Sequence, residues 1–349
     1  MNLKNIRQVV PYVPGEQPKT KVIKLNTNEN PYGPGENVKK VIKEFDEDVL
    51  RKYPDPDALS LREALAKYHN VSTDSVFVGV GSDDVLAMSF LTYFNGDKPI
   101  LFPDITYSFY DVWADLFKIP YETKALRDDF TIDPKDYEGE CGGIAIPNPN
   151  APTGIAEPVS FFEEMVKSHP ECMVIIDEAY VDFGAESCLP LTDKYDNVLV
   201  VRTFSKSRSL AGSRIGYAIG NPQLVKYLSD VKFSFNSYTM DSLTLAIGVA
   251  SVEDDKYFKN CVEKVINTRE NTKSALRELG FSFGDSMSNF IFASHKRVPA
   301  EKIFTELKAK GIYVRYFKKP RIDNYLRISI GTDEEMEELI NALRKIVET

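Results

Sequence analysis

The stretch VLVVRTFSKSRSLAGSRIGYAIG, residues 198–220, places two apolar runs on either side of a basic, hydroxyl-rich segment. The runs at 198–202 and 215–220 contain consecutive apolar residues, as is typical of strands buried on both faces of a sheet. The segment between them carries Lys206 among several hydroxyl groups, with Arg214 eight positions further on. The stretch therefore predicts two core strands, with an amine and a guanidinium at the end of the first, where functional residues collect in such sheets.

Apolar runs of the same kind recur along the chain and alternate with helical patterns. Strand-like runs occur at 76–80, 99–102, 143–146 and 173–177, and helix-period stretches at 60–69, 84–94 and 158–168. This alternation predicts an α/β fold with a mostly parallel sheet flanked by helices. Further strand-like runs at 289–294, 312–317 and 325–331 predict a smaller α+β domain. We expect a large domain over 30–245, and a small domain over 246–349 together with an N-terminal arm over 1–29.

Composition excludes several classes of protein. The net charge of −9 over 349 residues disfavours a general nucleic-acid binder, which needs a basic surface. No apolar run approaches the roughly 20 residues needed to span a bilayer, and the N-terminus lacks the apolar core of a secretory signal. The four cysteines show no paired spacing and the three histidines lie far apart, which predicts a cytoplasmic protein without a metal site.

Two further motifs directly follow predicted strands. In GVGSDDVL (79–86), a strand turns into a helix, so the backbone N–H groups near Ser82 and Asp83 favour an anion, unless the motif is only a helix cap. In IIDEAYVDF (175–183), Asp177 ends a strand and can pair with a protonated ring nitrogen, while Tyr180 can hydrogen-bond a ring oxygen. Magnesium binding as in an ATPase is disfavoured because no phosphate loop of the NTPase kind accompanies the acidic pair.

These motifs together describe one ligand. Thr203 and Ser205 can donate hydrogen bonds to a phosphate, Arg214 can add a charge-assisted bond, and the Lys206 amine can form an imine with an aldehyde. An aromatic aldehyde with a phosphate, a ring nitrogen and a phenolic oxygen is pyridoxal 5'-phosphate. The stretch IPNPNAPTG (146–154), taken alone, indicates only a rigid polar turn.

The ordered series NENPYGP, GSDD, NAPTG, DEAY and SKSRSLAGSRIGY resembles the fold-type I, class II aminotransferases that use pyridoxal phosphate, and in particular the histidinol-phosphate aminotransferase family. The resemblance covers nearly the whole chain. It implies that Lys206 forms the imine and then moves a proton between the substrate carbon and the cofactor. Asp177 would keep the ring nitrogen protonated. Tyr180 would donate to the ring oxygen, and Tyr107 would stack on the ring, although a core tyrosine is an alternative.

The same resemblance implies a phosphate site and a second subunit. The phosphate would be held by the following residues: Ser82, Asp83, Thr203, Ser205 and Arg214. Tyr53, in KYPDPD, is similar to a tyrosine that reaches the cofactor phosphate of the neighbouring subunit, which implies a homodimer.

One position departs from the family pattern. Many relatives have Asn-Pro-Thr-Gly where this chain has Ala151-Pro152-Thr153-Gly154, so the amide that would bind the ring oxygen is missing. Either Asn150 reaches in from the preceding position, or Tyr180 makes that hydrogen bond alone.

Substrate choice depends on anion-binding residues elsewhere. Arg327 in YLRISIG matches the family's C-terminal anion-binding arginine, Arg315 in YVRYF is a second candidate, and Tyr12 resembles a phosphate-contacting tyrosine. The resemblance implies transamination between glutamate and imidazole acetol phosphate, giving 2-oxoglutarate and histidinol phosphate in histidine biosynthesis. A threonine-phosphate decarboxylase and a broad aromatic-amino-acid aminotransferase of the same fold are the alternatives.

Overall fold

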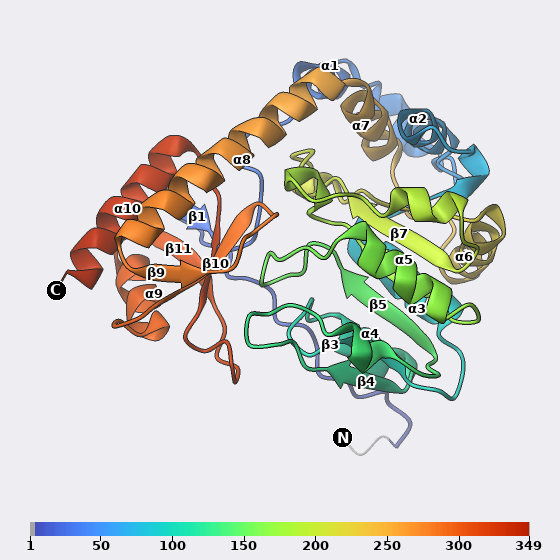
Figure 1. Cartoon of the computed structure of the whole chain (residues 1–349). Helices are drawn as coiled ribbons and strands as arrows, with labels where there is room; N and C mark the ends of the chain where they lie inside the picture. The colour runs from blue at the N-terminus through green and yellow to red at the C-terminus, as the bar shows by residue number, and fades with distance from the viewer. Residues whose placement is uncertain (1–3, 349) are drawn as a thin grey trace.

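The computed structural model describes residues 4–348, and in this part of the chain the strands form two β-sheets (Figure 1). The larger sheet has seven strands in the order β2 (Val76–Gly79), β8 (Gly216–Gly220), β7 (Val198–Thr203), β6 (Val174–Asp177), β5 (Gly143–Pro147), β3 (Ile100–Pro103) and β4 (Tyr121–Lys124). The smaller sheet has the order β1 (Ile23–Leu25), β11 (Ile312–Tyr316), β12 (Leu326–Ser329), β10 (Phe290–His295) and β9 (Phe281–Phe283). Residues 1–3 and 349, which belong to the predicted small domain and arm, lie outside the described residues.

The larger sheet is mostly parallel, as the sequence predicts. The pairs β3·β4, β3·β5, β5·β6 and β6·β7 are parallel, whereas β8 runs antiparallel to both β7 and β2. The register places Pro147 opposite Asp177 and Asp177 opposite Val201, so β5, β6 and β7 present their carboxyl ends at one edge.

Helices cover both faces of the larger sheet. The ten α-helices of the described chain are α1 (Glu36–Glu44), α2 (Leu59–His69), α3 (Gly81–Tyr93), α4 (Tyr110–Phe117), α5 (Val159–Ser168), α6 (Pro222–Phe235), α7 (Ser242–Glu253), α8 (Asp255–Glu278), α9 (Ala300–Ala309) and α10 (Asp333–Val347). Ile175 of β6 packs in a cluster with α3, α4 and α6, while its neighbours Val174 and Ile176 pack in a cluster with α5. Because successive residues of a strand face opposite sides, the continuous apolar runs follow directly from this two-sided burial.

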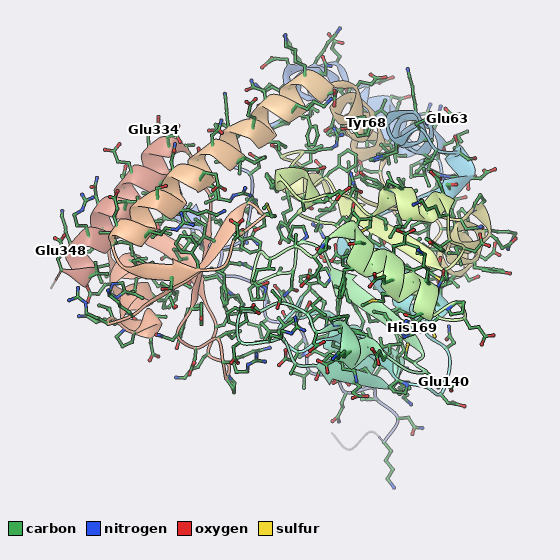
Figure 2. All side chains as sticks on the ribbon, viewed as in Figure 1. Glu63, Tyr68, Glu140, His169, Glu334 and Glu348 are labelled. Carbon is green, nitrogen blue, oxygen red and sulfur yellow. The ribbon has the colours of Figure 1, made fainter. Side chains whose placement is uncertain are left out.

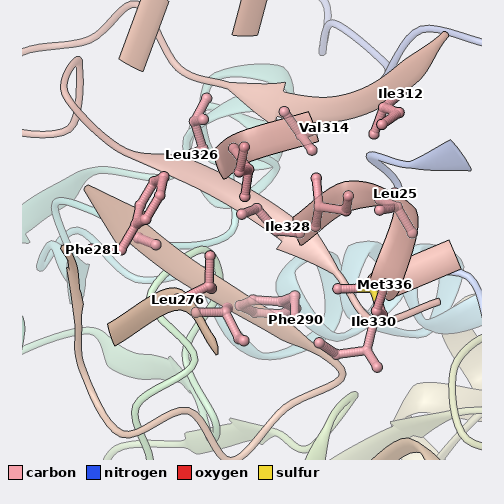
Figure 3. Close-up of a cluster of buried hydrophobic side chains, with 14 of the residues drawn as sticks. Leu25, Leu276, Phe281, Phe290, Ile312, Val314, Leu326, Ile328, Ile330 and Met336 are labelled. Atoms are coloured by element: carbon pink, nitrogen blue, oxygen red, sulfur yellow. The ribbon is translucent and has the colours of Figure 1, made fainter. Parts of the chain in front are cut away.

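The smaller sheet has its own apolar core. Side chains from its strands and from α8 and α10 converge there, including Leu25, Phe290, Ile328 and Met336 (Figure 3). Strand β1 belongs to the N-terminal arm and pairs in parallel with β11, Ile23 lying opposite Ile312. The sequence reasoning did not identify β1 or β9, because each has only three residues, or β4, because it is largely exposed.

Helix α7 packs with the elements around the larger sheet. Its residues Leu245 and Ile247 share a core cluster with Leu61 and Leu65 of α2. The domain boundary expected after residue 245 therefore falls inside this helix. The long helix α8 follows it and leads to the smaller sheet (Figure 1).

Charged side chains gather on the outside of the molecule. The exposed residues Glu63, Glu140, Glu334 and Glu348 lie at the outer edge in Figure 2. Within residues 4–348, no helix combines the length and the apolar character that crossing a bilayer requires.

Gly216, at the start of β8, lies where the larger sheet packs closely against the beginning of α3. A Cβ atom at this position would overlap the backbone of Gly81 and Ser82. Gly216→Ala should lower the free energy of unfolding by about 1–3 kcal/mol, measured by urea denaturation. Gly96→Ala is the matched control, because its Cβ would meet no atom within 4 Å. Equal unfolding midpoints for the two variants would show that the close approach is unimportant.

Candidate functional site

A cavity of about 270 Å³ lies where β5 and β6 end, next to the beginning of α3. Its walls come from the chain after β1, from the start of α3, from the strand ends and from the loop after β7. The lining residues are Thr27, Glu29, Ser82, Asp83, Tyr107, Pro147, Ala151, Asp177, Ala179, Tyr180, Ser205, Lys206, Ala211 and Arg214. The structure thus brings most of the sequence-predicted cofactor residues into one space.

Lys206 lies in the turn that follows β7 and is half-buried. Its Nζ donates to the backbone oxygen of Thr27 at 3.2 Å and lies 5.8 Å from the centre of the Tyr180 ring. Asn30 fixes the turn by donating from Nδ2 to the Lys206 carbonyl at 3.1 Å. In the described chain Lys206 forms no ion pair, so its amine is available to the cavity.

Asp177 ends β6 and is 5% exposed. Its carboxylate accepts from Ala179 N at 3.1 Å and from Tyr110 Oη at 3.4 Å, but no cation of the described chain pairs with it. Burial raises the pKa of Asp177 to about 7.

The adjacent carboxylate of Glu178 is in the opposite situation. It is buried, but it accepts from Arg202 at 2.8 Å, from Ser187 Oγ at 2.8 Å and from the backbone N–H of Cys188 at 2.5 Å. The Arg202 charge and these bonds oppose the rise in the pKa of Glu178 that burial causes. Of the two neighbouring carboxylates, therefore, only Asp177 lacks a positive partner and faces the cavity.

Arg214 lies at another side of the cavity, beside the first turn of α3. Its Nη2 pairs with Asp83 at 3.0 Å, and its Nη1 approaches Ser205 Oγ at 3.5 Å. Tyr107 Oη donates to the other Asp83 oxygen at 2.6 Å. The Asp83 carboxylate therefore positions an arginine and a tyrosine, which leaves the backbone N–H groups of the first turn and Arg214 as the anion-binding groups. Gly81, with φ of +83°, has no Cβ that would collide with the Arg214 guanidinium.

Three predicted cofactor residues, Thr203, Asn150 and Tyr53, do not line this cavity. Thr203 is buried beneath it, where its hydroxyl lies 3.0 Å from Ser205 Oγ. The Asn150 amide is fully engaged by protein groups: Nδ2 donates to Ile105 O at 2.9 Å and to Thr153 Oγ1 at 3.1 Å, and Oδ1 accepts from Thr106. Ala151 lines the cavity in its place. The expectation that Asn150 reaches in to bind the ring oxygen would therefore need an amide that is already hydrogen-bonded within the protein.

A second cavity of about 520 Å³ contains two of the three predicted substrate residues, Tyr12 and Arg315. Tyr12 stacks on Phe109 with 4.1 Å between ring centres, and Arg315 approaches the Val13 carbonyl at 3.4 Å. Both belong to the contact between the N-terminal arm and the rest of the molecule.

Arg327, on β12, lines neither cavity. Its Nη2 donates to Asn26 O at 3.1 Å, and its Nε is buried without a hydrogen-bond acceptor in the described chain. Its guanidinium lies over the rings of Phe290 and Phe317. Burial lowers the pKa of Arg327, with Tyr180, Tyr12 and Tyr107 among its electrostatic neighbours. An anion would supply the acceptor that Nε lacks.

Tyr53 is far more exposed than the other candidates, at 82%, and its ring packs against that of Tyr238 with 4.6 Å between ring centres and 30° between the ring planes. It does not line the cavity within its own chain. The expected contact with a neighbouring subunit stays a prediction.

The segment after β1 contributes residues to which the sequence reasoning gave no role. Thr27 and Glu29 line the cavity, and Asn28 donates from Nδ2 to Tyr180 Oη at 3.0 Å. Asn28 and Glu29 belong to the motif NENPYGP, and Thr27 directly precedes it. Nothing in the composition of the motif indicates which of its side chains faces the cavity.

The donor and acceptor groups of the cavity fit pyridoxal phosphate. An unpaired amine, a buried carboxyl without a cation, and an arginine beside a helix N-terminus match the aldehyde, the ring nitrogen and the phosphate. The buried, cation-free Asp177 is the most specific of these observations, because a protonated ring nitrogen would relieve its unfavourable environment.

The raised pKa of Asp177 predicts that the free energy of unfolding of the cofactor-free protein falls as this carboxyl ionises. The folded state binds this proton more tightly than the unfolded chain, so ionisation between about pH 4 and pH 7 removes stability. Asp177→Asn should therefore raise the free energy of unfolding by about 2–4 kcal/mol more at pH 8 than at pH 4. Urea denaturation of both proteins across this pH range measures the difference. A difference in free energy of unfolding between the two proteins that stays constant with pH would contradict a raised pKa for Asp177.

Comparisons with known proteins identify the family of this chain. The family model for class I and II aminotransferases matches residues 20–343. A histidinol-phosphate aminotransferase of Lactococcus lactis subsp. cremoris is 52% identical over 342 residues, covering 98% of this chain and 96% of that protein. One from Brachyspira hyodysenteriae is also 52% identical, over 343 residues, covering 98% of this chain and 97% of the relative.

A solved structure extends the agreement to the fold. The histidinol-phosphate aminotransferase from Sinorhizobium meliloti in complex with pyridoxal-5'-phosphate superposes with a TM-score of 0.88 at 24% identity, over 96% of this chain and 95% of that chain. The predicted fold class is thereby confirmed. Together with the full-length relatives and the matched family model, this places the chain in a family that its ordered motifs had indicated: it belongs to the class I and II aminotransferases.

Proposed function

We propose that the protein is a pyridoxal-phosphate-dependent aminotransferase that exchanges an amino group between glutamate and imidazole acetol phosphate. The products are 2-oxoglutarate and histidinol phosphate, and the reaction belongs to histidine biosynthesis. The observation that carries the proposal is one cavity that contains both the unpaired Lys206 amine and the buried Asp177 carboxyl. The choice of substrates is supported by relatives named histidinol-phosphate aminotransferase that align over nearly their full length.

Pyridoxal phosphate, when bound, supplies an aldehyde that condenses with amines and a ring that accepts electrons from the substrate carbon. Lys206 would provide the amine for this condensation and then carry a proton to and from the substrate carbon. Asp177 would hold the proton on the ring nitrogen. Tyr180 Oη would donate to the ring oxygen, while Arg214 and the first turn of α3 would bind the phosphate.

The two substrates share a need for anion recognition. Glutamate carries an α-carboxylate where histidinol phosphate carries a phosphate-bearing group, and a guanidinium binds either anion through paired hydrogen bonds. Arg327 suits this role because its buried Nε lacks an acceptor within the described chain. Arg315 and Tyr12, in the adjoining cavity, would complete recognition of the substrate.

We further propose that the enzyme is a cytoplasmic homodimer. Exposed apolar side chains occur on two neighbouring segments, with Leu50 and Tyr53 on one and Phe235 and Tyr238 on the other. The contact between the rings of Tyr53 and Tyr238 joins the two segments into one surface. Burying this surface against a second copy would allow Tyr53 to reach the partner's cofactor phosphate. The four free cysteines are compatible with a reducing compartment.

The reaction is tested by incubating the purified protein with glutamate and imidazole acetol phosphate. We expect 2-oxoglutarate and histidinol phosphate in equal amounts, because each amino group lost by one substrate is gained by the other. Release of carbon dioxide from threonine phosphate without a need for 2-oxoglutarate would favour the decarboxylase instead. Use of phenylalanine or tyrosine as efficiently as histidinol phosphate would indicate a broad aromatic aminotransferase.

The identity of the reactive lysine has a separate test. Borohydride reduction should attach the cofactor irreversibly to the wild-type protein, and Lys206→Ala should abolish this attachment, as measured by mass spectrometry. Lys24→Ala is the matched control, because Lys24 also contacts Thr27 but its amine is paired with Glu29. Persistent attachment in the Lys206→Ala variant would mean that another lysine reacts.

A further inference from the structure

The Tyr180 hydroxyl has one hydrogen-bonding partner in the described chain, and that partner is Asn28. Asn28 Nδ2 donates to Tyr180 Oη at 3.0 Å across a separation of 152 residues. Tyr180 is 9% exposed and Asn28 is 1% exposed, so this bond lies in the interior at the wall of the cavity. Because the amide donates, Tyr180 Oη accepts on this side and keeps its own hydrogen for another acceptor.

The orientation of the Asn28 amide is determined by Ser329. The backbone N–H of Asn28 donates to Ser329 Oγ at 2.9 Å, so the Ser329 hydroxyl must direct its hydrogen elsewhere. It donates to Asn28 Oδ1, also at 2.9 Å. With Oδ1 accepting from Ser329, the amide presents Nδ2 to Tyr180. Rotating it by half a turn would break the Ser329 donation and turn the amide oxygen toward Tyr180, whose hydroxyl would then donate to Asn28 and not into the cavity.

The backbone of Asn28 is adapted to this position. Its φ of 57° lies in the left-handed region, which asparagine tolerates better than most residues. The Asn28 carbonyl accepts from Asn289 Nδ2 at 2.9 Å, and Asn289 and Ser329 are both buried. The backbone of Asn28 is therefore fixed through both its N–H and its carbonyl group.

This arrangement bears on the missing amide at position 151. Ala151 lines the cavity without a polar side chain, and the Asn150 amide is occupied by Ile105, Thr106 and Thr153. Tyr180 is then the side chain left to bind the ring oxygen, and the direction of its O–H bond decides whether it can donate.

We propose that Asn28, oriented by Ser329, is a positioning residue that keeps the Tyr180 hydroxyl hydrogen directed into the cavity and so makes Tyr180 a dedicated donor to the cofactor's ring oxygen. The inference rests on the proposed function, since it requires pyridoxal phosphate bound next to Tyr180. It also connects two parts of the site, because Ser329 lies on β12 two residues after Arg327.

The test measures the pKa of the bound cofactor by absorbance titration of the holoenzyme. A phenol that donates to the ring oxygen stabilises its deprotonated form, so loss of the donor raises the pKa. Asn28→Gly removes the amide while preserving the left-handed backbone. It should raise the cofactor pKa by about half a unit to one unit, in the same direction as Tyr180→Phe. The double variant Asn28→Gly, Tyr180→Phe should match Tyr180→Phe alone.

A second variant approaches the same chain of bonds from its other end. Ser329→Ala frees the Asn28 amide to rotate, and should shift the cofactor pKa upward by a smaller amount that also disappears in the Tyr180→Phe variant. Asn26→Ala is the matched control, because this buried asparagine donates from Nδ2 to Glu16 O and not to Tyr180. We expect no shift for it.

The outcomes separate this inference from the proposed function. If the Asn28→Gly and Ser329→Ala proteins leave the cofactor pKa unchanged, or shift it equally with and without the Tyr180 hydroxyl, the positioning role is overturned while the cofactor assignment stands. If the wild-type protein itself shows no titrating cofactor absorbance, the proposed function fails and the inference fails with it.

Discussion

The burial of the Asp177 carboxyl at the end of β6 is the constraint on which the rest of the site depends. A carboxylate without a cation is unfavourable inside a protein, and it remains there because two-sided packing of the sheet fixes β6 in place. Its neighbour Glu178 forms an ion pair with Arg202. Of these two adjacent carboxyl groups, only Asp177 is buried without a cation of the described chain. A ligand with a positive ring nitrogen would offset the free-energy cost of burying the ionised Asp177 carboxyl. Binding of the cofactor and stability of the folded site therefore depend on the same interaction.

Around this point, the groups that would bind the cofactor are each held by another polar side chain. Asp83 aligns Arg214 and Tyr107, Asn30 holds the turn of Lys206, and Asn28 orients Tyr180. Each holds its partner through a directional hydrogen bond, and most of these bonds join segments far apart in the sequence. Geometry of this kind keeps reactive groups in place before a ligand arrives, which reduces the reorganisation that binding and catalysis require.

The sequence predicts those features of the fold and the site that a local pattern of residues determines, and not those that depend on tertiary contacts. The strand that ends at Asp177 and the strand that precedes Lys206 consist mostly of consecutive apolar residues, and a residue at the end of such a strand lies at the functional edge of the sheet. Strand β4 was missed because its residues are largely exposed, so no apolar run marks it. Asn150 and Ala151 are adjacent in sequence, and only the fold determines that the alanine faces the cavity while the asparagine is bound by neighbouring loops.

The bond between Asn28 and Ser329 joins residues 301 positions apart, and β1 must pair with β11 before the segment at 27–29 can form its wall of the cavity. A chain emerging from the ribosome therefore presents the Lys206 turn and the strand end at Asp177 long before the first residues of the protein have partners to pair with. Contacts of such long range form late and slowly. The complete cavity is consequently a late product of folding, so a tightly bound cofactor would report that both ends of the chain have reached their final places.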